Sequence, residues 1–84
     1  VLLEDPVYPG LRAVFASAGA RVAGVPMRSD GIDASALDAA LRRERPKLLV
    51  VTPNFQNPTG ATLPLEARRR LLEMAAAAGV MVVE

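Results

Sequence analysis

The chain has 84 residues, 51% of them hydrophobic and 4% aromatic, and its formal net charge is +1. This length allows one domain at most, and the near-neutral charge gives no electrostatic reason to expect a nucleic-acid partner. Because the chain has no Cys and no His, it offers neither a disulfide nor a metal site built on those residues.

The chain also lacks the signals of a membrane protein. No apolar run approaches the roughly 20 residues that span a bilayer, and the opening VLLEDP lacks the positive head and cleavage site of a signal peptide. Together with the missing cysteines, these features predict a soluble protein without a membrane partner, in a reducing, cytoplasmic setting.

The first predicted elements are a strand over residues 1–3 and a helix over residues 11–18. The apolar side chains of this helix follow the i, i+3, i+4, i+7 spacing, and Gly19 is a suitable residue to end it. The side chains expected to face inward are Leu11, Val14, Phe15 and Ala18.

A second strand is predicted over residues 21–25, followed by a second helix that ends at Arg45, before Pro46. Asp33 and Ser35 are both plausible N-caps of this helix. Its expected inward residues are Leu37, Ala40 and Leu41.

A third strand is predicted over residues 48–52, a third helix over residues 64–78, and a fourth strand over residues 80–83. Pro64 suits the first turn of the helix, and Gly79 suits its end. Its apolar residues are Leu71, Leu72, Met74 and Ala75. The basic runs RRERPK and RRR are predicted to be solvated helix faces, with Glu44 and Glu66 nearby.

The predicted order β-α-β-α-β-α-β builds an α/β fold with a mostly parallel sheet and covering helices. Each apolar run lacks polar alternation, so we expect the strands to be buried on both faces. Because the chain begins in a strand and finishes just after one, we expect residues 1–84 to be part of a larger domain, truncated at both ends.

Ligands of such sheets bind beyond the carboxyl ends of the strands, which here lead into EDPVYPG, PMRSDG and TPNFQNPTG. The first loop holds Tyr8 between two prolines. Its ring could cover the sheet edge or provide a platform for a ligand. The segment NPTG could likewise be an ordinary turn, because Asn-Pro and Gly are common in turns.

Five segments in order, EDPVYPG, AGARVAGVP, RPKLLVVTP, PNFQNPTG and GVMVVE, resemble the class I/II pyridoxal-phosphate-dependent aminotransferases of fold type I, over essentially the whole chain. This resemblance implies that the chain is part of their large, cofactor-binding domain. It also implies that the Asn57 side-chain amide donates to the cofactor's ring oxygen, that the Asn57-Pro58 bond is cis, and that Tyr8 stacks on the pyridine ring.

The resemblance further implies a homodimeric parent enzyme that transfers an amino group between an amino acid and a 2-oxo acid. The family's Schiff-base lysine lies well downstream, so we assign no catalytic residue here and expect the isolated chain to be inactive. Two alternatives stay open. The segment EDPVYPGLRAVFASAGARV is at least as typical of the aminotransferase-like domain of MocR/GntR-type transcription regulators, and the chain could also be a nonfunctional gene fragment.

Overall fold

The computed structural model describes residues 1–54, 56 and 59–84. Within them, the strands are β1 (Leu2–Asp5), β2 (Ala23–Arg28), β3 (Gly31–Ile32), β4 (Leu48–Val50) and β5 (Met81–Val83). The helices are α1 (Pro9–Ser17), α2 (Ala34–Glu44) and α3 (Leu65–Ala78). All four predicted strands and all three predicted helices are present, within a few residues of their expected bounds.

The strands form one sheet in the order β3-β2-β1-β4-β5. The central strand β1 runs parallel to β2 and to β4, and β4 runs parallel to β5. The mostly parallel α/β fold is therefore confirmed. The short strand β3 was not predicted; it folds back from β2 as an antiparallel edge, pairing Met27 with Ile32.

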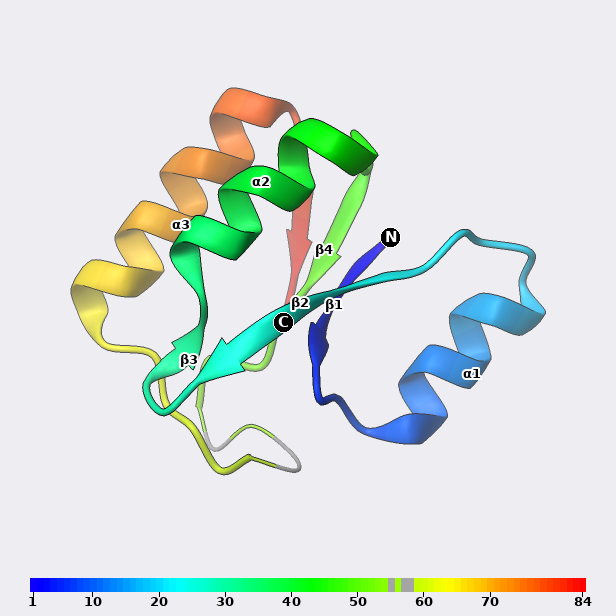
Figure 1. Cartoon of the computed structure of the whole chain (residues 1–84), viewed down its shortest axis with the longest axis horizontal. Helices are drawn as coiled ribbons and strands as arrows, with labels where there is room; N and C mark the ends of the chain where they lie inside the picture. Colours follow the sequence, from blue (N-terminus) through cyan, green and yellow to red (C-terminus); the bar gives the residue numbers. More distant parts are fainter. Residues whose placement is uncertain (55, 57–58) are drawn as a thin grey trace.

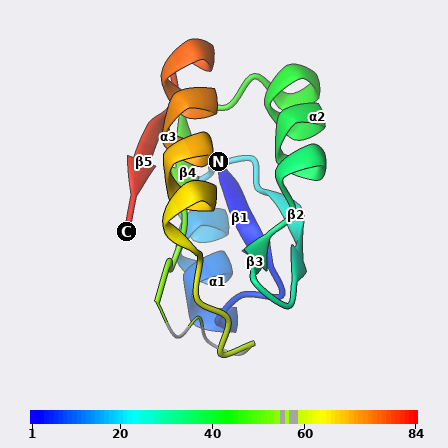
Figure 2. The ribbon, with the colours of Figure 1, turned by 90° about the vertical axis from the view of Figure 1, so that its left-hand side faces the viewer.

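Helices α2 and α3 lie side by side against one face of the sheet, and α1 lies on the other side (Figures 1 and 2). The core fills the space between the sheet and the α2–α3 layer, and burying each large aliphatic side chain there contributes about 1.5–3 kcal/mol. Its members are Leu2, Val25, Ile32, Leu37, Ala40, Leu41, Leu49, Val51, Leu63, Leu71, Ala75 and Val80.

The ends of α2 and α3 follow from local chemistry. Asp33 is the N-cap of α2, since its side chain accepts a hydrogen bond from the Ala36 N–H at 3.1 Å. The choice between Asp33 and Ser35 is thereby settled. Gly79 ends α3 with φ of 69°, a left-handed conformation that suits glycine, as expected.

Several apolar side chains that were predicted to face inward are exposed. No residue of α1 is buried, and Val14 is 63% exposed. On the edge strand β5, Met81 is 67% exposed, so that strand is not covered on both faces. On α3, Leu72 is exposed although Leu71 and Ala75 are buried. Within the described chain, these side chains therefore lie outside the core that α2 and α3 cover.

No helix among the described residues is long and apolar enough to cross a membrane.

Candidate functional site

The loops that follow β1 and β4 leave the same edge of the sheet. The two strands are parallel neighbours, with Leu2 opposite Leu49 and Leu3 opposite Val50. Their carboxyl ends therefore lie side by side, on the lower side of Figure 1, where the turn between β2 and β3 also lies. This is the edge at which open α/β sheets bind ligands.

Tyr8 lies in the loop after β1, directly before the first residue of α1. Its carbonyl accepts from the Leu11 N–H at 3.0 Å, which closes the first turn. The ring passes close to Gly10, where a Cβ atom would lie 2.7 Å from Tyr8 Cε1. Since Tyr8 is 58% exposed, much of its ring surface is available to a ligand.

Asn57 and Pro58 lie outside the described residues, so the expected contact of Asn57 and the cis Asn57-Pro58 bond stay predictions. The structure does contain a cis bond between Asp5 and Pro6, at the start of the Tyr8 loop. It also describes Gln56 and Thr59, which flank the two predicted residues.

Gln56 ties the two loops together. Its side chain is 1% exposed, and its Nε2 donates to the Pro6 carbonyl at 2.8 Å. Its Oε1 accepts from the Thr59 N–H at 3.0 Å and from Thr59 Oγ1 at 2.6 Å. Its backbone N–H donates to the Ala61 carbonyl at 2.9 Å, and its own carbonyl accepts from the Gly60 N–H. One buried amide therefore fixes its own loop and reaches across to the loop of Tyr8.

Glu4 is a second buried polar side chain at this edge, 1% exposed. Its Oε1 accepts from the Thr52 N–H at 3.0 Å, which joins the end of β1 to the chain just after β4. Its Oε2 has no hydrogen-bond partner among the described residues. Burial raises the pKa of the Glu4 carboxyl, and the Thr52 N–H and the nearby Gln56 side chain offset only part of that rise.

The raised pKa of Glu4 predicts a pH-dependent gain in stability for Glu4→Gln. Folding favours the protonated carboxyl, so its contribution is fully present below the ordinary pKa of 4.5 and is lost as the pH rises through the higher folded-state pKa. Glutamine keeps an acceptor for the Thr52 N–H without the charge.

The unfolding temperature of Glu4→Gln should therefore be higher than that of the wild type at about pH 7, and this difference should shrink as the pH falls. A margin that stays constant across the pH series would contradict this assignment.

Arg68, on α3, donates hydrogen bonds to both ends of the loop that precedes α3. Its Nε donates to the Leu63 carbonyl at 2.8 Å, and its Nη2 donates to Asn54 Oδ1 and, at 3.4 Å, to the Pro53 carbonyl. The prediction that the RRR run is a solvated face is therefore wrong for Arg68. Its neighbour Arg69 does lie on an exposed face, 3.9 Å from the exposed Glu66 carboxylate.

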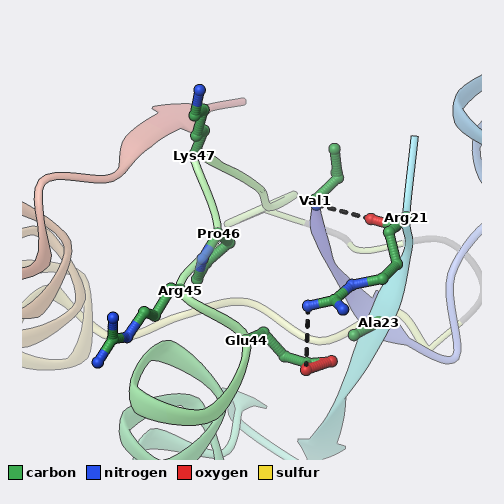
Figure 3. A pocket seen from close by; sticks show the side chains of 7 residues that line it. All are labelled: Val1, Arg21, Ala23, Glu44, Arg45, Pro46 and Lys47. Atoms are coloured by element: carbon green, nitrogen blue, oxygen red, sulfur yellow. Dashed lines mark hydrogen bonds and ion pairs between the residues drawn. The ribbon is translucent and has the colours of Figure 1, made fainter. Parts of the chain in front are cut away.

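A hollow lies at the amino end of the strands, opposite the edge that carries Tyr8 and Gln56 (Figure 3). It has a volume of about 310 Å³, and its lining residues include Val1, Arg21, Glu44 and Lys47. The Val1 amino group donates to the Arg21 carbonyl at 2.8 Å, and the Arg21 guanidinium lies 3.7 Å from the Glu44 carboxylate. Tyr8, the one predicted site residue that the structure describes, does not line this hollow. Across the described chain, no cluster of three or more acidic residues could hold a metal ion.

Comparison with known proteins identifies the family. Residues 1–83 match the model of the family described as Aminotransferase class I and II. The chain belongs to this family. The family predicted from the five sequence segments is therefore confirmed.

Individual class I and II aminotransferases and related proteins match almost the whole chain. A 2-aminoadipate transaminase from Thermus thermophilus is 49% identical over 100% of this chain and 21% of its own length. The HTH-type transcriptional regulator TauR from Rhodobacter capsulatus is 40% identical over 98% of this chain and 16% of its own length. The chain thus spans about a fifth or less of these relatives.

Solved structures show the same fold. The alpha-aminoadipate aminotransferase of Thermus thermophilus, complexed with N-(5'-phosphopyridoxyl)-L-leucine, superposes with a TM-score of 0.91 at 48% identity, covering 98% of this chain and 21% of that one. This likeness confirms that the chain has the fold of the fold type I aminotransferases.

Proposed function

We propose that the protein carrying this chain is a pyridoxal-phosphate-dependent aminotransferase and that residues 1–84 belong to its large, cofactor-binding domain. When bound, pyridoxal phosphate acts as an electron sink that lets an amino acid give up its nitrogen to a 2-oxo acid. The observation that carries the proposal is the Gln56–Pro6 hydrogen bond, which joins the loops of Tyr8 and Asn57 at one sheet edge in a chain of this family.

The described residues fit such a cofactor. Tyr8 offers an exposed aromatic surface on which a pyridine ring could stack. Asn57 would donate its amide N–H to the negatively charged ring oxygen, and a neutral donor stabilises that charge without bringing a competing proton. The buried contacts of Gln56 and Glu4 hold the surrounding loops in place.

Assays on the full protein test this proposal directly. The purified protein with pyridoxal phosphate should convert an amino acid to its 2-oxo acid while a second 2-oxo acid gains the amino group. A panel of 2-aminoadipate, aromatic and branched-chain donors would define the substrate class. If the protein bound the cofactor but showed no turnover with any donor, the enzymatic proposal would fail.

A regulator is the second candidate, because the 40% identical relative TauR is an HTH-type transcriptional regulator. A protein of this kind would use an aminotransferase-like domain to sense a ligand and a separate helix-turn-helix to bind DNA. The sequence upstream of Val1 and a DNA-binding assay distinguish the two. Specific DNA binding without transamination would favour the regulator.

The remaining parts of the proposal are a homodimer, which the family resemblance supports, and a cytoplasmic location, for which the sequence without cysteine is the support. Size-exclusion chromatography with light scattering on the full protein measures the oligomeric state. A monomer that retains full activity would contradict the proposed dimer.

Replacing Tyr8 tests the stacking role. Tyr8→Ala should weaken pyridoxal phosphate binding to the full protein by about 3- to 10-fold, the value expected for losing an aromatic contact. Tyr8→Phe keeps the ring and is the matched control, so it should bind the cofactor nearly as well as the wild type. Dissociation constants from absorbance titration give the comparison. If Tyr8→Phe were as weak as Tyr8→Ala, the hydroxyl rather than the ring face would be the contact.

A further inference from the structure

Glu4 and Gln56 are polar side chains that are buried where the Tyr8 loop meets the loop after β4. Burying apolar side chains there would cost less free energy of desolvation. Each is 1% exposed; Glu4 lies near the carboxyl end of β1, and Gln56 lies in the loop that follows β4. A buried carboxyl or amide destabilises a fold unless its hydrogen bonds are made. The hydrogen-bond partners of these two side chains therefore show which segments they join.

Their hydrogen bonds cross between segments that are far apart in the sequence. The bond from Gln56 to Pro6 spans 50 positions, and the bond from Thr52 to Glu4 spans 48. The Gln56–Pro6 bond connects the segment after β1, and the Thr52–Glu4 bond connects the end of β1 itself, to the segment after β4. Gln56 also holds Thr59, which in turn accepts from the Ala61 N–H at 3.2 Å, so the far side of its own loop is fixed as well.

We propose that Glu4 and Gln56 form a polar clamp that holds the Tyr8 loop against the described residues after β4, namely Thr52, Gln56 and Thr59. The consequence of the clamp for cofactor binding rests on the proposed function. Glu4 and Gln56 are then positioning residues that set where the Tyr8 ring lies relative to the loop after β4. They act through the two loops and need not touch the cofactor.

The clamp predicts that loosening one loop also loosens the other. In the full protein without cofactor, Gln56→Ala should accelerate amide hydrogen exchange in peptides covering residues 7–12 by about 10-fold, because the bond to Pro6 is lost. Gln56→Glu should do the same, since a carboxylate cannot donate to that carbonyl. Glu4→Ala should also accelerate exchange there, whereas Glu4→Gln keeps the acceptor for Thr52 and should retain slow exchange.

A matched control separates this effect from a general loss of stability. Leu41→Ala removes a buried side chain of α2 and should lower the unfolding temperature at least as much as Gln56→Ala does. Its exchange over residues 7–12 should stay at the wild-type rate. If Leu41→Ala and Gln56→Ala accelerated exchange equally, the clamp would be refuted.

Cofactor binding provides a second readout. Gln56→Ala should raise the dissociation constant of pyridoxal phosphate by about 10-fold. In the double variant Tyr8→Ala/Gln56→Ala, the dissociation constant should rise by less than the product of the two single increases, because both substitutions act on one contact.

The two proposals can fail separately. If the wild type does not bind pyridoxal phosphate, the proposed function is overturned. If the wild type binds the cofactor but Gln56→Ala changes neither exchange nor affinity, the clamp alone is overturned.

Discussion

Asn57→Ala is expected to weaken pyridoxal phosphate binding to the full protein by about 10- to 100-fold, the value of a hydrogen bond to a charged group. It should also move the pH at which the bound cofactor changes absorbance to a higher value. The amide proposed at the ring oxygen withdraws electron density from it, so without the amide the cofactor holds its proton more tightly. Absorbance titration of the purified variant measures both quantities.

Asn54→Ala is the matched control, because it removes an amide from the same loop. The Asn54 side chain accepts from Arg68, and we give it no part in binding the cofactor. Its pH titration should follow that of the wild type. An unshifted titration in Asn57→Ala would remove the contact assigned to Asn57, even if affinity fell.

Most of the fold could be predicted because its signals are local. Continuous apolar runs marked β1 and β4, and both strands are buried as expected. The helix ends were also encoded locally, by Asp33 at the start of α2 and by Gly79 at the end of α3. Propensity and capping act over a few residues, so a single sequence is enough to reveal them.

Features that depend on distant neighbours could not be predicted. The two residues of β3 carry no pattern of their own, and they form a strand only because β2 offers a free edge. The apolar spacing on α1 correctly predicted a helix, but no residue of α1 is buried in the described chain. Periodicity shows that a face is apolar, whereas burial depends on what packs against it.

The candidate site likewise has parts that the sequence predicted and parts that it did not. Its position at the strand ends, and the place of Tyr8 there, followed from the parallel order of the strands. Glu4 and Gln56 were missed because a glutamate at a strand end and a glutamine in a loop are usually solvated. The sequence did contain one signal for Glu4, which continues the apolar run of a central strand. Arg68 was missed because one side chain of a basic run cannot be told from its neighbours by spacing.

The contact between Gly31 and Leu63 provides the last prediction. Gly31 lies in β3 with φ of 116°, and a Cβ there would come within 2.5 Å of Leu63 Cδ2. The Leu63 side chain is buried, so it has little free space to move into. The Leu63 backbone is also held, because its N–H donates to the Pro53 carbonyl at 2.7 Å and its carbonyl accepts from Arg68. Gly31→Ala should therefore lower the free energy of unfolding by about 2–4 kcal/mol, through backbone strain and overpacking together.

Gly79→Ala is the reference for a glycine of positive φ whose substitution meets no neighbouring atom. Gly79 also has a positive φ, 69°, but no atom lies within 4 Å of the position its Cβ would take. Its substitution should reduce stability by only about 1 kcal/mol. Urea denaturation of both variants measures the difference, which combines the packing of Leu63 under β3 with the greater backbone strain at the φ of Gly31. Equal losses would mean that Leu63 moves aside freely, and the loop between β4 and α3 would then not be anchored at its base as the structure indicates.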